Sequence, residues 1–328
     1  MSMIDRAGGP SGAGQALGEL PAAGGEDERG TSLLRGAMQR LVRNPVAIVG
    51  ALIVLAFVTV AVLADVIAPY EPAGAQWGNQ ITPSSVPGPS DEHLLGLDSF
   101  GSDLFTQLVH GARQSLVIGV VSTSVGLFFG MLLGLASGAF GRWVDTLLMR
   151  GVDIMLSIPS LLMAVSIAAL MSPHMSRLAP RFGDWVLGLP LMIAIAVVQI
   201  PIFARLLRGS LLAQRSADYV LASTSLGLRR RTVVMSHMLP NSLGPVIVQA
   251  TLVLATAIIE VAALSFLGLG EPNPTVAEWG RMLVKSQDRL ETSPQLALLP
   301  GVLIAVTALG FTLIGEAMRE ALDPKFRR

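Results

Sequence analysis

The residue types that usually carry catalysis or metal binding are scarce in this chain of 328 residues. Cysteine is absent, which excludes disulfides, thiolate nucleophiles and cysteine-ligated metals. The histidines are scattered, without the spacing of metal ligands, at His93, His110, His174 and His237. The lysines are Lys285 and Lys325, and neither follows the glycine of a phosphate-binding loop. The sequence therefore predicts a protein with no catalytic residues and no metal site.

Two carboxylates stand out because they lie within long apolar segments. A charge in such a segment is costly and usually faces a cavity or a partner. Asp153 lies near the end of its segment, where it can reach the boundary of the apolar region. Glu260 lies deeper, which makes it a candidate for lining a translocation pathway. The alternative for Glu260 is a structural hydrogen bond between helices.

The elements that hold these residues are long apolar blocks. Hydrophobic residues make up 52% of the chain and charged residues 14%, against about 25% charged in ordinary soluble domains. Several blocks reach the roughly 20 residues that cross a bilayer. Six transmembrane helices are predicted, at 46–68, 115–138, 148–171, 185–207, 245–268 and 295–317. The fold class is all-α integral membrane, and the formal net charge of zero gives no pull toward nucleic acid.

The distribution of basic residues predicts the orientation. Arginines cluster before the first span, between the fourth and fifth spans and at the C-terminus, whereas 69–112 contains no Lys or Arg. The positive-inside rule then places both termini in the cytoplasm. The run Val46–Ala64 exceeds the apolar region of a signal peptide, so we expect it to remain as the first span.

The predicted organisation has four parts. Residues 1–45 form a cytoplasmic tail that is largely disordered, and 46–112 hold the first span and an extracytoplasmic loop. The core transmembrane bundle covers 113–318, with a cytoplasmic segment at 208–243. Residues 319–328 form a second cytoplasmic tail. Whether the N-terminal tail has a role stays open.

Glycine and proline recur within the predicted spans. Gly126, Gly130 and Gly134 form two overlapping GxxxG spacings on one helix face, which allows another helix to approach closely. Proline inside a membrane helix usually kinks it, because neighbouring groups satisfy the freed carbonyl. Kinks are predicted at Pro159, Pro190, Pro201 and Pro300.

The segment 208–243 is patterned more regularly than a simple connection. Ser216 is a suitable N-cap and Gly227 a suitable end for a helix at 217–226, about 15 Å long. Its spacing puts Tyr219, Ala222 or Ser223, and Leu226 on one face. A second short helix at 229–239 is expected to stop at Pro240. An apolar stripe on this exposed segment indicates either a helix on the membrane surface or a helix docked to a partner.

Residues 221–240 resemble the cytoplasmic "EAA" signature of ABC importer permeases. Leu221-Ala222-Ser223 occupies the Glu-Ala-Ala triplet, Gly227 falls on the glycine, and Leu239-Pro240 on the terminal Leu-Pro. The chain departs from the motif at Leu221, Ser223 and His237, which stand for Glu, Ala and Ile. The loss of the glutamate puts one expected polar contact in doubt, and whether it weakens coupling stays open.

Further segments resemble dipeptide and oligopeptide permeases of the C type, in the family's own order. They are HLLGLDSFGSDLFTQLVHGARQSL at 93–116, RWVDTLLMRGVDIMLSIPSLL at 142–162, EVAALSFLGLGEPNPTVAEWGRML at 260–283 and ALDPKFR at 321–327. Together they cover most of the chain after the N-terminal tail. The resemblance implies a type I ABC importer fold of the MetI-like kind.

The resemblance also implies a mechanism and a set of partners. The EAA helix of the family is the coupling helix, which sits in a cleft of an ATPase subunit. The residues it implies here are Asp218, Tyr219, Ala222, Ser223, Leu226, Gly227, Leu239 and Pro240. The expected partners are a homologous B-type permease, two ATPases that carry ATP and Mg²⁺, and an extracytoplasmic binding protein. The chain itself is expected to need no cofactor and to lie in the bacterial cytoplasmic membrane.

Three alternatives remain open at this stage. The solute could be a nickel chelate or glutathione instead of a peptide, because related permeases share these motifs. A stand-alone secondary transporter would show inverted internal repeats, yet no second copy of the 216–241 pattern occurs. An intramembrane enzyme would need a Ser/Lys or His/Asp set or paired acids at one depth.

Overall fold

The computed structural model describes residues 33–72, 76–82, 86–139, 142–270, 273 and 276–322. These residues are mostly helical, and an isolated β-bridge joins Leu97 to Asp103. Residues 1–32 of the predicted N-terminal tail (1–45) and 323–328 of the predicted C-terminal tail (319–328) lie outside the described residues. Within the predicted N-terminal tail, however, Leu33–Arg43 forms a helix.

The α-helices are α1 Leu33–Arg43, α2 Pro45–Val62, α3 Ala64–Ile67, α4 Leu104–Ala139, α5 Arg142–Ser157, α6 Ser160–Phe182, α7 Leu189–Gln214, α8 Asp218–Ser225, α9 Arg230–Thr232, α10 Leu239–Leu264, α11 Trp279–Ser286 and α12 Gln295–Leu322. Short 3₁₀ turns cover Gly78–Gln80, Asp184–Gly188 and Gln287–Arg289, and π-helical stretches cover Val233–Met238 and Ser265–Leu269. Six helices are long and apolar enough to cross a membrane, which confirms the predicted number.

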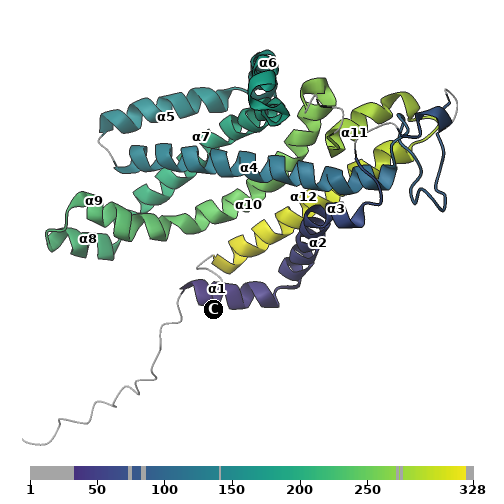
Figure 1. Ribbon diagram of the computed structural model, residues 1–328. Helices are drawn as coiled ribbons and strands as arrows, with labels where there is room; N and C mark the ends of the chain where they lie inside the picture. Colours follow the sequence, from purple (N-terminus) through teal and green to yellow (C-terminus); the bar gives the residue numbers. More distant parts are fainter. Residues whose placement is uncertain are drawn as a thin grey trace, which may run out of the picture.

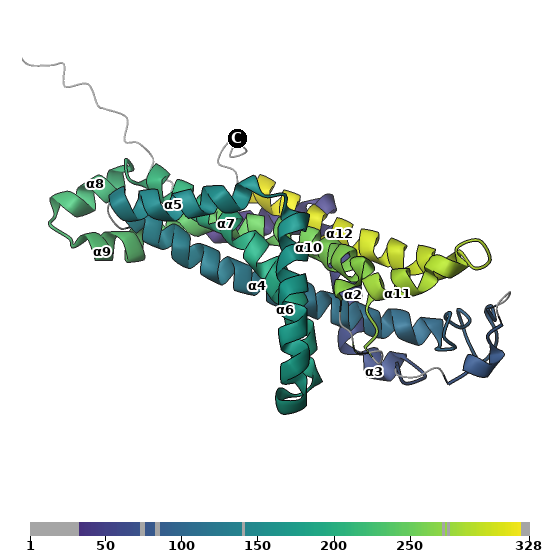
Figure 2. The same ribbon diagram turned by 90° about the horizontal axis from the view of Figure 1, so that it is seen from above.

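Helices α4, α5, α7, α10 and α12 share one main direction, whereas α2 is steeply inclined to it (Figure 1). The α8–α9 hairpin lies at one end of the molecule, called here the α8 end, and α11 lies near the other, the α11 end. Helix α6 does not follow this direction: Figure 2 shows it projecting from the side of the body, crosswise to α4. Its contacts are mainly with α7 and the turn between them.

The most extensive helix contact is that of α4 with α7, and glycines allow it. Added β-carbons at Gly126, Gly130 and Gly134 would stand 2.8, 2.6 and 2.7 Å from atoms of α7. Side chains at these positions would therefore push the two helices apart. The predicted GxxxG face is confirmed, and Gly138 extends it by one more turn against Leu211.

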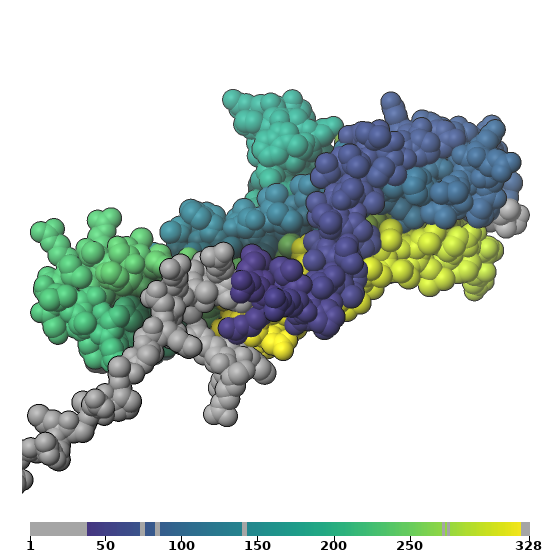
Figure 3. All heavy atoms as spheres, turned by 90° about the horizontal axis from the view of Figure 1, so that it is seen from below, coloured from purple at the N-terminus to yellow at the C-terminus, as the bar shows by residue number. Residues whose placement is uncertain are grey.

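A second layer joins the N-terminal helices to α12. Figure 3 shows α1 and α2, in purple, lying across the yellow α12. Gly50 of α2 touches the backbone of Gly310, so α2 and α12 also meet at glycines. Asn44 accepts a hydrogen bond from the Val46 N–H and begins α2, while its Nδ2 donates to Glu320 of α12. These contacts fix the first membrane helix on the last one.

The third span differs from its prediction at 148–171. The chain breaks at Ile158 and Pro159, and the membrane-length helix is α6, which continues to Phe182. Pro159 has an extended ψ of 129° and no N–H, so α5 ends before it and a new helix begins after it. Pro159 thus separates two helices instead of kinking one, and the loop expected at 172–184 is helical to Phe182.

The other prolines behave differently from one another. Pro190 lies in the first turn of α7, where a missing N–H costs little, whereas Pro201 and Pro300 lie inside α7 and α12. Pro240 was expected to stop a helix and does not. It lies in the first turn of α10, directly after the π-helical stretch, and the helix runs on from Arg230 to Leu269.

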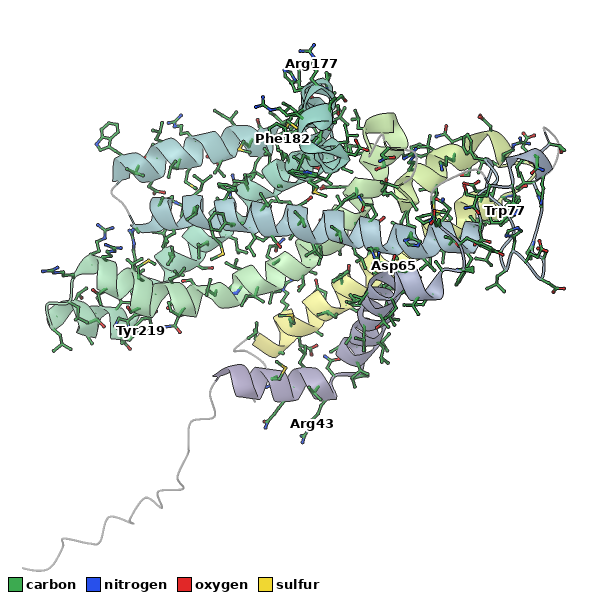
Figure 4. All side chains as sticks on the ribbon, viewed as in Figure 1. Arg43, Asp65, Trp77, Arg177, Phe182 and Tyr219 are labelled. Carbon is green, nitrogen blue, oxygen red and sulfur yellow. The ribbon has the colours of Figure 1, made fainter. Side chains whose placement is uncertain are left out.

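The α11 end carries a compact cap on the bundle. Trp279 is fully buried and its indole N–H donates to the Leu108 carbonyl oxygen of α4 at 3.0 Å. A β-carbon at Gly280 would lie 2.7 Å from the Ala262 carbonyl oxygen of α10, so α11 presses on two helices at once. Trp77, labelled in Figure 4, packs edge-on against His93, whose Nδ1 lies 3.0 Å from Asp103.

Candidate coupling site

The turn after α8 is built around Gly227. Gly227 has φ of +78°, a left-handed conformation that glycine adopts without steric cost. The Leu228 N–H bonds to the Ser223 carbonyl oxygen and the Gly227 N–H to that of Thr224. This pair of bonds is a Schellman motif, which satisfies carbonyls that the helix end would leave free. The prediction that Gly227 ends this helix is confirmed.

The start of α8 differs from the prediction. Its N-cap is Ala217, with extended backbone angles and no side-chain cap bond, and Ser216 lies one residue earlier. The helix covers Asp218–Ser225, so Asp218 occupies the first turn, where the helix dipole favours an acid. The predicted cap failed because Ser216 is one residue too early to reach the free N–H groups.

The predicted stripe on α8 is divided between two faces. Tyr219 and Ser223 are half-buried, and the Tyr219 hydroxyl donates to Gln214 at 2.5 Å. Figure 4 shows Tyr219 at the α8 end. Ala222 is exposed together with Asp218 on the neighbouring face, about 100° around the helix. Val220, not included in the prediction, is the buried residue that joins α8 to the core beneath it.

Exposed apolar side chains surround this turn. Leu226 is 83% exposed and Leu221 53%. Leu228 and Met235 extend the same apolar surface. Leu221 was noted in the sequence only as a departure from the motif glutamate. Leu221 is an apolar residue in a helix that was expected to be exposed, and this could have indicated that it belongs to the apolar surface around the turn.

The second half of the motif closes the hairpin. Leu239 is half-buried against the core that also holds Val220 and Val234. Pro240 is exposed and begins α10. The Leu-Pro pair therefore joins the hairpin to a long membrane helix without interrupting it.

A charged cluster holds the helices below the hairpin. Arg208 of α7 makes two bonds to Asp145 of α5, at 2.5 and 2.7 Å, and Ser137 of α4 donates to the same carboxylate. Arg215 donates to the Gly138 carbonyl oxygen at 2.6 Å. The Arg208 hydrogen bonds lower the pKa of Asp145 to about 2. Three helices are thus joined directly beside α8.

Comparisons with known proteins agree with this architecture. A family model described as "Binding-protein-dependent transport system inner membrane component" matches residues 126–328, more than half of the chain. The chain belongs to this family. A second model, the N-terminal TM domain of oligopeptide transport permease C, matches residues 32–85 and so accounts for α1 and α2.

Individual relatives cover nearly the whole chain. It is 41% identical to the dipeptide transport system permease protein DppC of Alkalihalophilus pseudofirmus, over 89% of this chain and 90% of the relative. It is 39% identical to the di/tripeptide transport system permease protein DppC of Pseudomonas aeruginosa, over 90% and 93%. A chain of the inward-facing MetNI methionine ABC transporter superposes with a TM-score of 0.52 at 19% identity, over 67% and 98%. The predicted type I importer fold is confirmed.

The two acids that the sequence placed in apolar segments lie in different settings in this inner membrane component, and Asp153 lies on α5, outside the six membrane-length helices. Asp153 is exposed on α5 and lies 2.5 Å from Arg205 of α7. Glu260 is half-buried on α10 and has no ion pair or hydrogen bond to another described residue. The structural alternative for Glu260, a hydrogen bond between helices of this chain, therefore finds no support among the described residues.

Proposed function

We propose that this chain is the C-type permease subunit of an ATP-driven importer of di- and oligopeptides, and that it forms half of the translocation pathway. Two relatives that it matches along 90% and 93% of their lengths are named for dipeptide and di/tripeptide transport. The observation that carries the proposal is the α8 hairpin. It is a rigid, glycine-ended turn with exposed Leu221 and Leu226, mounted directly on the end of a membrane helix.

The hairpin has the features of a coupling helix that docks on an ATPase subunit. Ala222 is small and exposed, so a partner backbone can approach the helix closely. Leu221 and Leu226 both expose apolar surface at this hairpin, and a contiguous exposed apolar patch is typical of a protein contact surface. Because the motif glutamate is replaced by Leu221, docking depends on apolar contact together with Asp218. The inward residues Tyr219, Ser223 and Leu239 hold the hairpin in place.

Force from the ATPase would reach the membrane through α7. Helix α8 follows α7 after three residues, and α7 packs on α4 along the glycine face. The Asp145–Arg208 ion pair joins α5 to α7 as well. A displacement of the hairpin would therefore move α4, α5 and α7 together.

The other subunits follow from the same proposal. Helix α6 exposes Leu162 and Leu170, at 61% and 72%, and it projects from the side of the body (Figure 2), with Arg177 at its outer edge in Figure 4. This helix is the contact that we assign to a homologous B-type permease. Two ABC ATPases would supply ATP and Mg²⁺, and an extracytoplasmic binding protein would deliver the solute at the α11 end.

The α8 end would face the cytoplasm. Its turn exposes Arg229, Arg230 and Arg231, and basic residues favour the cytoplasmic side. The last turn of α12 contacts α1, so both termini would lie on this side as well. The protein would thus be a multi-pass component of the bacterial inner membrane with cytoplasmic termini.

Uptake of labelled dipeptide into liposomes that contain the complete transporter tests the proposal. Ala222→Glu places a charge on the docking face, and we expect ATP-driven uptake to fall more than tenfold, with loss of ATPase subunits in a pull-down. Ala222→Ser keeps the size and neutrality and should retain near-normal uptake. Transport by the chain alone, driven by an ion gradient and without a copurifying ATPase, would contradict the proposal.

A further inference from the structure

An open groove of about 720 Å³ lies between α5, α7 and α10. Leu156 of α5 lies on one side, and Pro245 and Gln249 of α10 lie on the other. The floor belongs to α7 and consists of Ile202, Arg205, Leu206, Gly209, Ser210 and Ala213. Ligand pockets measure roughly 300–1,000 Å³, so the groove has room for a short peptide.

A positive and a negative charge stand together at this groove. Arg205, which lines it, donates to Asp153 at 2.5 Å, and the two side chains are 57% and 62% exposed. An exposed pair of this kind contributes little to stability, because water competes for both charges. Either side chain can therefore leave this ion pair and bind a charged group of a solute instead, at a small cost in free energy.

The open face of α10 continues the polar lining beyond the groove. At 3.6 residues per turn, Gln249, Thr256 and Glu260 fall within an arc of about 60° that also contains Pro245. Thr256 is exposed, and Gln249 and Glu260 are half-buried. From Gln249 to Glu260 this row is about 16 Å long, at about 1.5 Å per residue.

Other parts of α10 pack against neighbouring helices. Ala257 and Val261 pack into the core shared with α6 and α7. Leu252 packs on Gly315 of α12, and Ala262 packs on Gly280 of α11. The positions of α10 that this chain leaves uncovered thus include the polar row, alongside the exposed apolar side chains Ile247 and Ile259. Glutamate and glutamine facing hydrocarbon would be costly, so this face must meet water or protein.

We propose that the open face of α10 (Gln249, Thr256 and Glu260), together with Arg205 and Asp153 at the groove, is the surface along which a zwitterionic short peptide crosses the membrane. The peptide carboxylate pairs with Arg205, and its ammonium group pairs with Glu260 or Asp153. This inference rests on the proposed function and names the residues that the solute meets.

The arrangement of charges favours passage of the solute over tight binding at one position. The charges are spread over a row longer than a dipeptide, so no single position satisfies both ends of the solute and all of its polar groups. Arg205 also has Asp153 as a ready partner once the solute leaves, because the two side chains already touch. Both properties keep the affinity along the path low, which a transporter needs for release.

Cysteine accessibility tests whether water reaches the open face of α10. Because the chain has no cysteine, Gln249→Cys and Thr256→Cys each introduce a single thiol. In the complete transporter, we expect a charged methanethiosulfonate reagent to modify both, read as the intact mass of this chain, in the nucleotide-free or the ATP-bound state. A dipeptide-loaded binding protein under turnover should slow the reaction. Leu55→Cys, on the exposed apolar face of α2, is the control and should stay unmodified.

Uptake measurements test the two charges. Arg205→Gln and Glu260→Gln should each lower dipeptide uptake about tenfold, the loss expected for one charged hydrogen bond, with basal ATP hydrolysis unchanged. Arg150→Gln and Glu316→Gln alter exposed charges on α5 and α12 and should leave uptake unchanged.

The outcomes separate the two proposals. Absence of ATP-driven uptake in the unaltered transporter overturns the proposed function. Normal uptake in both charge variants, or thiols at 249 and 256 that stay unmodified in every state because the second permease covers them, overturns only the assignment of this surface.

Discussion

Gly130 of α4 lies directly against Phe203 of α7: a β-carbon on the glycine would stand 2.6 Å from the Phe203 Cβ and 2.8 Å from the Ile200 carbonyl oxygen. Two membrane helices therefore touch backbone to side chain over several turns. Since α7 leads directly to α8, the packing at Gly130 determines how rigidly the hairpin is mounted.

Gly130→Ala should destabilise the bundle. The new methyl group forces α4 and α7 apart, and overpacking of this kind costs about 1–3 kcal/mol. We expect a lower thermal midpoint in lipid nanodiscs. Gly301→Ala in α12 is the matched control, since no atom lies within 4 Å of its β-carbon, and it should be neutral or slightly stabilising. Equal effects at both positions would show that the glycine face is not a close contact.

Asp145→Asn should loosen the cluster below the hairpin. The change removes the charged partner of Arg208, which is itself only 30% exposed, at a cost of about 1–2 kcal/mol. Because the pKa of Asp145 is held at about 2, below its ordinary value of 3.8, its contribution is present above about pH 4 and is lost between pH 4 and 2. Thermal midpoints against pH should show this loss in the unaltered chain only.

The number of membrane spans and the glycine contacts follow from the sequence. The direction in which a helix such as α6 runs does not. Apolar blocks of about 20 residues determined the number of spans, and the glycine spacing and Gly227 were predicted correctly. The break at Pro159 was missed because the sequence is apolar on both sides of it, so hydropathy shows one continuous span. Hydropathy also cannot show that α6 turns away from the bundle.

The α8 hairpin shows a second limit of sequence patterns. Helical spacing correctly grouped Tyr219 with Ser223, but spacing cannot tell which neighbour a face meets. Val220 faces the core and Ala222 faces outward, because the ends of α7 and α10 fix how α8 rests on them. The π-helical stretch before Pro240 likewise cannot be predicted from a periodicity of 3.6 residues per turn, which describes α-helices only.

Gly227→Ala should weaken coupling by straining the turn. A β-carbon in the left-handed conformation costs about 1–2 kcal/mol, and nothing lies near enough to clash, so the effect is on the backbone alone. We expect reduced uptake per ATP hydrolysed. Gly227→Asn is the matched variant, because asparagine tolerates this conformation and should recover most of the coupling. Equal losses in both variants would instead assign the effect to the side chain.

Glu278→Gln should stabilise the α11 cap at neutral pH. Glu278 is fully buried at the start of α11, where one carboxylate oxygen accepts the Gly280 N–H at 2.9 Å. Burial raises its pKa to about 6, against an ordinary value of 4.5. The folded protein therefore holds this proton more tightly than the unfolded chain does, and its stability should fall as the pH rises from about 4.5 to about 6.

Glutamine can keep the bond to Gly280 without a charge, so the variant should lose this pH dependence and gain about 2 kcal/mol at pH 7. Thermal midpoints measured from pH 4 to 8 would show the two curves meeting near pH 4 and separating above it. Glu291→Gln, at an exposed position on the same loop, is the control and should follow the unaltered chain. A Glu278→Gln curve parallel to that of the unaltered chain would mean that Glu278 stays ionised across this range. Protonation of Glu278 would then make no contribution to the stability of α11.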